Sequence, residues 1–185
     1  MSFYLAVWSI FMLSWAVWIY IPIFRAPHGQ TRSSVTAKRP TWIGIALELA
    51  AYSVALAFSQ AEVPDWPRLV AAAIAAPLGA VVMWMAVAHL GRQFRINAGL
   101  YHDHELVRTG PYALVRHPIY ASMLLMLVAT AMLMTRPAFM VPAFALFLFG
   151  TEVRVRTEDG LLASRFGDHF IAYRRQVSAY IPFVR

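Results

Sequence analysis

The chain has 185 residues, of which 60% are hydrophobic and only 14% charged, and its formal net charge is +7 at pH 7. An average soluble domain has about 25% charged residues, so this composition indicates an integral membrane protein and excludes an ordinary soluble enzyme. The sequence contains no cysteine, which excludes disulfide bonds and thiolate metal sites.

Five apolar runs predict membrane helices. They cover residues 3–24, 42–59, 69–90, 118–134 and 138–150. A spanning helix needs about 20 apolar residues, so the first three runs are long enough by themselves and the last two are short. A turn at residues 135–137 separates the last two, which predicts a tight helical hairpin. We therefore predict an all-α integral membrane protein with about five transmembrane helices and a cytoplasmic C-terminal helical tail.

The basic residues predict the orientation of the chain. Most lie in residues 25–39, 92–116 and 154–185, and Arg68 and Arg136 lie elsewhere. With five spans, the three basic segments share one side, which the positive-inside rule assigns to the cytoplasm. We expect a bacterial-type inner membrane, with the N-terminus outside and the C-terminus and active site cytoplasmic. The net charge then reflects topology, which argues against nucleic-acid binding.

Glu48 is an acidic residue inside the second apolar run. An acid within a span is by default a hypothesis of function. The structural alternative is a protonated or hydrogen-bonded glutamate at a helix contact, or one close enough to the interface to be wetted. The sequence leaves both interpretations open.

Residues 91–116 form a polar connector, which divides the chain into three N-terminal helices (1–90) and a catalytic region (91–185). Connectors of this length are usually functional or disordered, and this one is a candidate lid. His102 and His104 raise the possibility of a metal site, but they lack a helical His-x-x-x-His spacing and a third ligand. A solvated loop is favoured, and no metal is predicted.

A polar cluster stands at the start of the fourth apolar run. Arg116 and His117 precede Pro118, and Tyr120 follows within one turn. Proline fits the first turn of a helix, so Pro118 predicts a helix start. The free N–H groups of that turn attract anionic groups.

A second cluster follows the fifth run. Arg154 and Glu158 are four residues apart, so on a helix they share a face and can form a simple solvated pair. Because these charges, with Asp159, continue from an apolar helix, they are expected at the depth of Arg116 and His117. Cations, carboxylates, an imidazole and phenols together suit a zwitterionic ligand with hydroxyl groups.

Several motifs follow one another over residues 91–185: Gly110-Pro111-Tyr112, Arg116-His117-Pro118-Ile119-Tyr120, Arg154-x-x-x-Glu158-Asp159, Phe166-Gly167 and Ile181-Pro182-Phe183. Their order and spacing resemble the isoprenylcysteine carboxyl methyltransferase family and its phospholipid N-methyltransferase relatives. The resemblance implies a membrane methyltransferase that uses S-adenosylmethionine and acts on a hydrophobic or lipid-attached acceptor.

The resemblance also implies the site. Arg154 and Glu158 would be catalytic, and Arg154 would orient an acidic acceptor group. The cofactor would be held by Tyr112, Leu114, Arg116, His117, Tyr120, Glu158 and Asp159. A carboxylate nucleophile would need mainly positioning and electrostatics, whereas an amine would need a base such as Glu158 or His117. The family often has glycine in place of Ser122 and Glu-Glu in place of Glu158-Asp159, which leaves the acceptor open.

Two other functions share part of this pattern. Sterol reductases similar to this chain near the C-terminus carry an Arg-His-Pro-x-Tyr element, but they bind a reduced nicotinamide cofactor and have more spans. A non-catalytic membrane scaffold is the third possibility, and it predicts that replacement of Arg116 or Glu158 leaves function unchanged.

Overall fold

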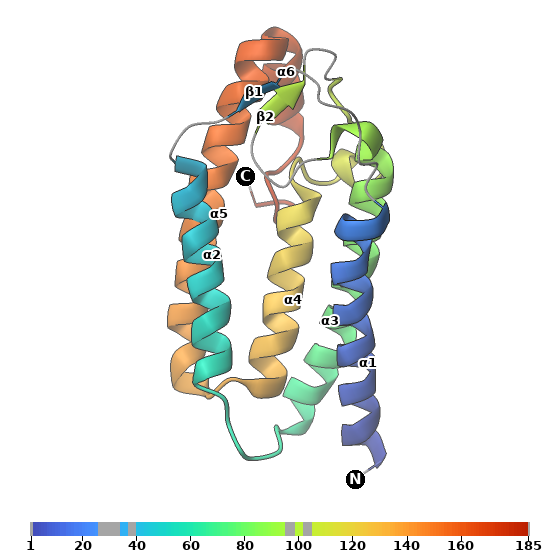
Figure 1. The fold of residues 1–185 in the computed structure, drawn as a ribbon, viewed down its shortest axis with the longest axis vertical. Helices are drawn as coiled ribbons and strands as arrows, with labels where there is room; N and C mark the ends of the chain where they lie inside the picture. The colour runs from blue at the N-terminus through green and yellow to red at the C-terminus, as the bar shows by residue number, and fades with distance from the viewer. Residues whose placement is uncertain (1, 26–33, 37–39, 95–98, 102–104, 185) are drawn as a thin grey trace.

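The structure is a computed structural model that describes residues 2–25, 34–36, 40–94, 99–101 and 105–184. It is an elongated bundle of helices (Figure 1). The helices are α1 (Ser2–Tyr20), α2 (Pro40–Ala57), α3 (Trp66–Leu90), α4 (Pro118–Met134), α5 (Pro137–Phe166) and α6 (Asp168–Gln176). Shorter turns are the π-helical Ile21–Arg25 and the 3-10 helices Gly91–Gln93 and Gly110–Ala113. The predicted helical architecture is confirmed.

One feature of the backbone was not predicted. The strands β1 (Ser34–Thr36) and β2 (Gly99–Tyr101) pair in antiparallel register, with Ser34 opposite Tyr101. The pair joins the connector after α1 to the connector after α3. It lies at the same end of the bundle as α6 (Figure 1).

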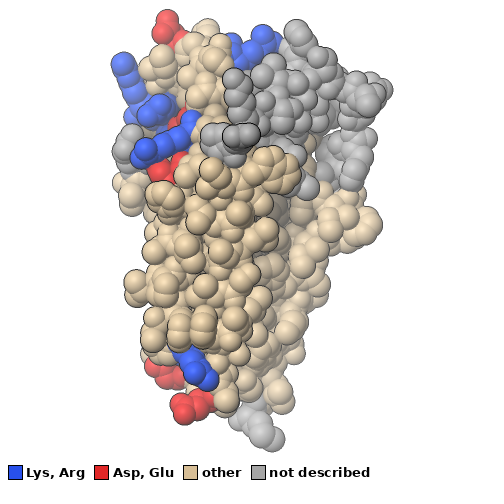
Figure 2. Space-filling view, turned by 60° about the vertical axis from the view of Figure 1, so that its left-hand side comes forward, with Lys and Arg blue, Asp and Glu red and all other residues tan. Residues whose placement is uncertain are grey.

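The apolar helices agree in position with the five predicted runs. Among the described residues, three helical stretches are long and apolar enough to cross a membrane, namely Ser2–Phe24, Trp66–Leu90 and Pro137–Phe166. Thr41–Ala57 and Pro118–Met134 are apolar but shorter. On the face in Figure 2, charged side chains gather at the two ends of the molecule, as expected of a membrane protein. That all five helices cross the bilayer remains a prediction.

Helix α5 is much longer than its apolar part. Its 30 residues span about 45 Å at about 1.5 Å per residue, whereas the hydrocarbon core is about 30 Å thick. The charged residues of α5 begin at Glu152, so they lie in its C-terminal half. That this half extends beyond the apolar layer remains a prediction. The connection from α4 to α5 is short, but α5 packs mainly on α2, and α4 mainly on α3. The tight packing of a hairpin therefore remains a prediction.

The core consists of two clusters that meet at α4. One joins α1, α3 and α4 through Phe11, Leu69 and Leu133, and the other joins α2, α4 and α5 through Leu127 and Phe147. Alanines fill much of both contacts, which lets the helix backbones approach closely. The bundle is therefore two helix groups that share α4 as their common wall.

The contact of α2 with α5 is especially close at two glycines. A Cβ on Gly44 would lie 2.8 Å from the carbonyl oxygen of Gly150, and a Cβ on Gly150 would lie 2.7 Å from that of Gly44. Neither position has room for a side chain without a backbone shift. The two glycines therefore set the distance between these helices.

The C-terminal segment closes one end of the bundle. The backbone N–H groups of Arg116 and His117 donate to the carbonyl oxygens of Ser178 and Ala179, both at 2.8 Å. The tail after α6 is thereby paired, like a strand, with the residues that precede α4. The predicted C-terminal helix is α6, and it lies directly beside the first polar cluster.

Candidate functional site

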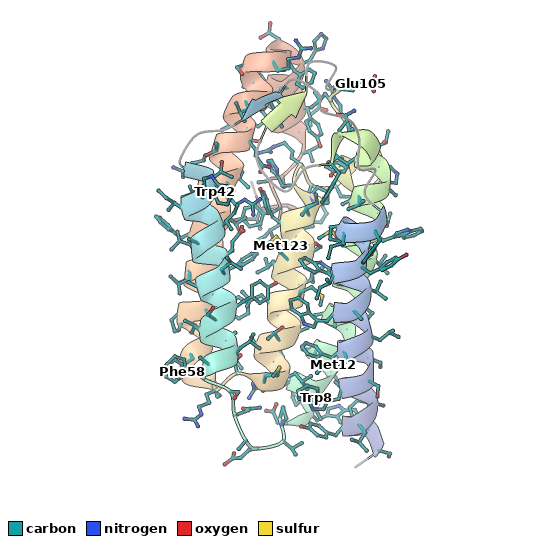
Figure 3. The ribbon with its side chains drawn as sticks, viewed as in Figure 1. Trp8, Met12, Trp42, Phe58, Glu105 and Met123 are labelled. Carbon is teal, nitrogen blue, oxygen red and sulfur yellow. The ribbon has the colours of Figure 1, made fainter. Side chains whose placement is uncertain are left out.

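A cavity of about 840 Å³ opens at the start of α4 and continues between α1, α2 and α4. Its volume lies in the range of about 300–1,000 Å³ that is typical of ligand pockets. Figure 3 shows Glu105 near one end of the bundle, Met123 on α4, and Met12 lower on α1; all three line the cavity. The cavity thus extends from a polar end near α6 into the apolar middle of the bundle.

The polar end of the cavity lies at the N-terminus of α4. Pro118 is the first residue of the helix, as the sequence predicts. Arg116 and His117 come just before it, and their backbone is held by the paired C-terminal tail. Both side chains are nearly buried, with 8% and 7% of their surfaces exposed. The cluster is therefore built by helix α4 and the tail together.

Both ring nitrogens of His117 face carboxylates. Nε2 lies 2.9 Å from Oδ1 of Asp159, and Nδ1 lies 3.3 Å from Oε2 of Glu158. Burial lowers the pKa of His117, but the hydrogen bonds with Asp159 and Glu158 outweigh it and raise that pKa from 6.5 to about 8. Since each carboxylate accepts a hydrogen bond and the imidazolium carries an N–H on both ring nitrogens, the protonated form satisfies both contacts.

Arg116 joins the cluster to the tail. Its Nη2 donates to Oδ2 of Asp159 at 2.9 Å, and its Nη1 donates to the carbonyl oxygens of Arg174 and Val177. Asp159 therefore accepts from both Arg116 and His117. Its role in the structure is to hold these two side chains in place.

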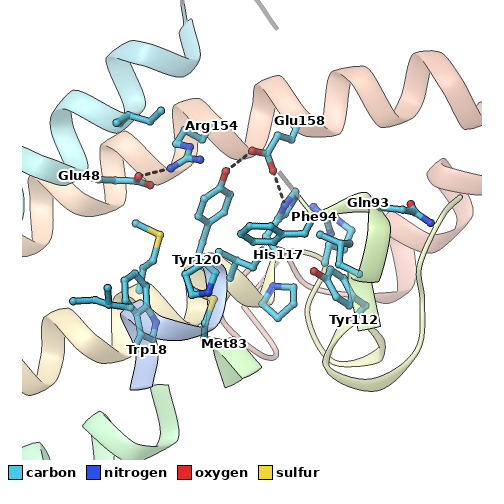
Figure 4. A pocket seen from close by; sticks show the side chains of 18 of the residues that line it. Trp18, Glu48, Met83, Gln93, Phe94, Tyr112, His117, Tyr120, Arg154 and Glu158 are labelled. Atoms are coloured by element: carbon cyan, nitrogen blue, oxygen red, sulfur yellow. Dashed lines mark hydrogen bonds and ion pairs between the residues drawn. The ribbon is translucent and has the colours of Figure 1, made fainter. Parts of the chain in front are cut away.

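A chain of contacts links α4, α5 and α2 across the cavity wall (Figure 4). The Tyr120 hydroxyl donates to Oε1 of Glu158. The guanidinium of Arg154 lies 4.7 Å from the centre of the Tyr120 ring, within range of a cation–π contact. Nη1 of Arg154 donates to Oε2 of Glu48 at 2.7 Å. Arg154 thus reaches across to another helix instead of forming only the local pair that its spacing suggests.

The other half of the cavity is apolar and rich in aromatic rings. Phe11, Trp15 and Trp18 of α1 line it, and neighbouring rings pack edge to face. The Trp18 indole N–H donates to Oγ of Ser122 at 3.2 Å. The Tyr52 hydroxyl donates to the carbonyl of Met123 at 2.7 Å, so this ring is also held in place. The wall suits an apolar ligand segment.

Most of the predicted site residues come together. Six of them line the cavity: Tyr112, Arg116, His117, Tyr120, Arg154 and Glu158. Asp159 is 6% exposed and lies behind Arg116 and His117. Leu114 is 70% exposed and does not line the cavity, so the structure gives it no place there. The cofactor-binding and catalytic roles of these residues remain proposals.

Sequence reasoning missed several lining residues. Trp18, Gln93 and Glu105 were not singled out, although Gln93 and Glu105 lie in the polar connector 91–116. A signal for Trp18 exists, since Phe11, Trp15 and Trp18 recur every three or four residues and therefore share one helix face. Gln93 and Glu105 carry no comparable pattern; they are brought together by a hydrogen bond from the Glu105 N–H to the Gln93 side chain.

No group of three or more His, Asp or Glu side chains that could hold a metal ion occurs within the described part of the chain. His102 and His104, which the sequence singles out, lie outside the described residues.

Residues 71–164 match the family model described as the isoprenylcysteine carboxyl methyltransferase (ICMT) family. The chain is 32% identical over 111 residues to a protein-S-isoprenylcysteine O-methyltransferase of Tribolium castaneum, an alignment that covers 58% of this chain and 39% of that protein. It is 31% identical over 110 residues to a probable enzyme of the same name from Oryza sativa subsp. indica, covering 58% and 57%.

A third relative has a different name. The chain is 36% identical over 101 residues to the cobalt-zinc-cadmium resistance protein CzcN of Cupriavidus metallidurans, which covers 54% of this chain and 42% of that protein. The chain spans about half the length of the curated relatives that it matches.

Proposed function

Because the chain belongs to the isoprenylcysteine carboxyl methyltransferase family, we propose that it is an integral membrane methyltransferase that uses S-adenosylmethionine to methylate a hydrophobic or lipid-attached acceptor. One observation carries the proposal. A single cavity joins a buried cluster of Arg, His and Glu side chains to an aromatic wall in the middle of the bundle. A charged methyl donor and an apolar acceptor can therefore meet within one space.

The residues present fit S-adenosylmethionine. The donor carries a carboxylate, an ammonium, a ribose diol and a sulfonium. It therefore needs positively and negatively charged side chains beside an aromatic surface. Arg116, His117 and Glu158 supply the charged groups, and Tyr112 and Tyr120 supply aromatic rings, all on the cavity wall. When bound, the donor would supply a methyl group on sulfur that is activated for displacement. We propose that these five residues hold it, with Asp159 fixing Arg116 and His117.

The acceptor end lies where Arg154 and Tyr120 border the apolar wall. An acceptor whose tail packs on Trp15 and Trp18 would bring its head group to Arg154 and Glu158. A carboxylate needs no base, and Arg154 would orient it. An amine would be deprotonated by Glu158, which lines the cavity.

The remaining parts of the proposal concern placement. We propose that the cavity's polar end faces the cytoplasm of a bacterial-type inner membrane, because α6 and the basic tail lie at that end. Gln93 and Glu105 line the cavity from the connector, which supports its role as a lid. We also propose that the chain divides into an N-terminal unit (1–90) and a catalytic unit (91–185). Both units contribute residues to the cavity wall.

Calorimetry on the detergent-purified protein tests this function. S-Adenosylmethionine and S-adenosylhomocysteine are expected to bind in the micromolar range, and Glu158→Ala is expected to abolish binding. Glu152→Ala is the matched control, since this glutamate lies on the same helix but is exposed and paired with Arg156. Binding of a reduced nicotinamide cofactor alone would contradict the proposal in favour of a reductase. Binding of neither would favour a non-catalytic scaffold.

A further inference from the structure

Helix α2 lies outside the matched residues 71–164, yet it contributes a charged group to the cavity wall. This group is Glu48, whose surface is only 2% exposed. An acid inside an apolar helix is costly unless it is paired. The groups that pair with Glu48 therefore indicate its role.

The backbone of α2 and α5 is shaped around this acid and its partner. A Cβ on Gly44 would lie 2.4 Å from Cγ of Arg154, so the absence of a side chain at residue 44 leaves room for the arginine stem. Gly44 lies one turn from Glu48, and Gly150 lies one turn from Arg154. The close approach of the two glycines thus brings the acid and the guanidinium into direct contact.

Both oxygens of Glu48 are engaged. Oε2 accepts from Nη1 of Arg154 at 2.7 Å, and Oε1 accepts from the Thr151 hydroxyl at 3.1 Å. Arg154 in turn covers the ring of Tyr120, whose hydroxyl donates to Glu158. Glu48 is therefore the far end of a chain of contacts that reaches the proposed methyl-transfer site.

The negative charge of Glu48 weakens the attraction of Arg154 for an acidic acceptor. Near the cavity, Asp159 balances Arg116, and Glu158 and Asp159 share the His117 imidazolium. Glu48 adds a negative charge directly on the guanidinium of Arg154. An acidic head group drawn to that guanidinium must approach a second carboxylate, and charges interact strongly in a dry interior. An amine head group meets no such repulsion.

We propose that Glu48 is a positioning residue that holds Arg154 against Tyr120 and offsets its charge, and that it thereby sets the selectivity of the acceptor site between acidic and amine head groups. The selectivity part rests on the proposed methyltransferase function. The wild-type site is then less favourable to an acidic head group than Arg154 alone would be. Neutralising Glu48 shifts the preference toward acids.

The test compares two probes with one tail, N-acetyl-S-farnesylcysteine, which is acidic, and S-farnesylcysteamine, which is an amine. Their dissociation constants are measured in nanodiscs by tryptophan fluorescence, for which Trp15 and Trp18 in the wall are reporters. For Glu48→Gln we expect the ratio of amine to acid dissociation constants to rise at least about tenfold, because one carboxylate charge is removed from beside the head group. The exposed Glu152→Gln should leave the ratio unchanged.

An unchanged ratio in folded Glu48→Gln, or an equal loss of affinity for both probes, would overturn the proposal, since a merely structural residue acts on both alike.

If Glu48→Gln does not fold, because it leaves a buried cation unpaired, Glu48→Asp replaces it. The shorter aspartate keeps the charge but draws it away from Arg154, so a shift in the same direction of about two- to threefold is expected, and no shift overturns the proposal. Calorimetry with S-adenosylmethionine and methylation of both probes are run in parallel. Because the ratio is measured by binding alone, it tests Glu48 even if neither probe is methylated.

Discussion

The clearest test of the buried cluster is to measure the protonation of His117 as a function of pH. In the folded protein its pKa is raised to about 8, whereas the ordinary value is 6.5. Folding therefore favours the protonated ring, and the stabilisation is fully present below pH about 6.5 and is lost as pH rises through about 8. A difference of about 1.5 pKa units corresponds to about 2 kcal/mol. The contribution of His117 to the free energy of unfolding should accordingly fall by about this much between pH 6 and pH 9.

The assay isolates this contribution by difference. Chemical unfolding in detergent is followed over that pH range for the wild type and for His117→Gln, whose amide does not titrate. The stability advantage of the wild type should shrink by about 2 kcal/mol as pH rises. His169→Gln is the control for the loss of an imidazole, because His169 is exposed on α6.

A direct titration can refute the reasoning. The ring carbon signal of His117, assigned by its loss in His117→Gln, should shift with a midpoint near pH 8. Asp159→Asn should move the midpoint downward, since it removes the carboxylate 2.9 Å from Nε2. A midpoint at or below 6.5, or an advantage of the wild type that does not change with pH, would show that the two carboxylates do not stabilise an imidazolium.

Three further predictions follow from the packing. Gly44→Ala should lower the free energy of unfolding by about 1–3 kcal/mol through overpacking. Gly160→Ala, where an added Cβ meets nothing within 4 Å, should leave it unchanged. Equal effects of the two substitutions would contradict the close contact of α2 and α5. Truncation after Gln176 removes the segment that pairs with the residues before α4, and should weaken S-adenosylmethionine binding at least about tenfold in calorimetry; unchanged binding would exclude a role for the tail. Tyr173→Phe removes a hydroxyl that donates to the carbonyl of Tyr112, and should cost about 1 kcal/mol of unfolding free energy; a neutral result would mean that water replaces this bond.

The helices could be predicted from the sequence because their signals are local. Apolar runs give the positions of all five long elements, and Pro118 gives the start of α4. The proximity of Arg116, His117 and Glu158 followed from motif order and from the depth of two helix ends. These inferences need only the composition of a segment and its nearest neighbours. They do not require knowledge of which helices pack together.

The pairings across helices could not be predicted in this way. The spacing of four residues favoured a contact between Arg154 and Glu158, but Arg154 also donates to Glu48, which lies 106 residues away. That contact depends on how closely two backbones approach, and the glycines that permit it are not recognisable as partners in the sequence. Leu114 also lies among the motif residues, but its side chain is 70% exposed, and its cofactor-binding role stays a prediction. Neighbourhood in the chain did not bring its side chain into the cavity.

The distribution of the family match across the cavity has a consequence for specificity. The matched residues 71–164 include most of α3, all of α4 and most of α5, together with Arg116, His117 and Glu158. The facing wall comes from α1 and α2, which supply Trp18 and Glu48 and lie outside the match. Family membership therefore bears on the residues proposed to hold the methyl donor and the acceptor head group, whereas it says little about the wall on α1 and α2. We expect substitutions on α1 and α2 to change which acceptor binds while leaving binding of the methyl donor intact, and calorimetry on the Glu48→Gln variant would contradict this if donor affinity fell together with acceptor affinity.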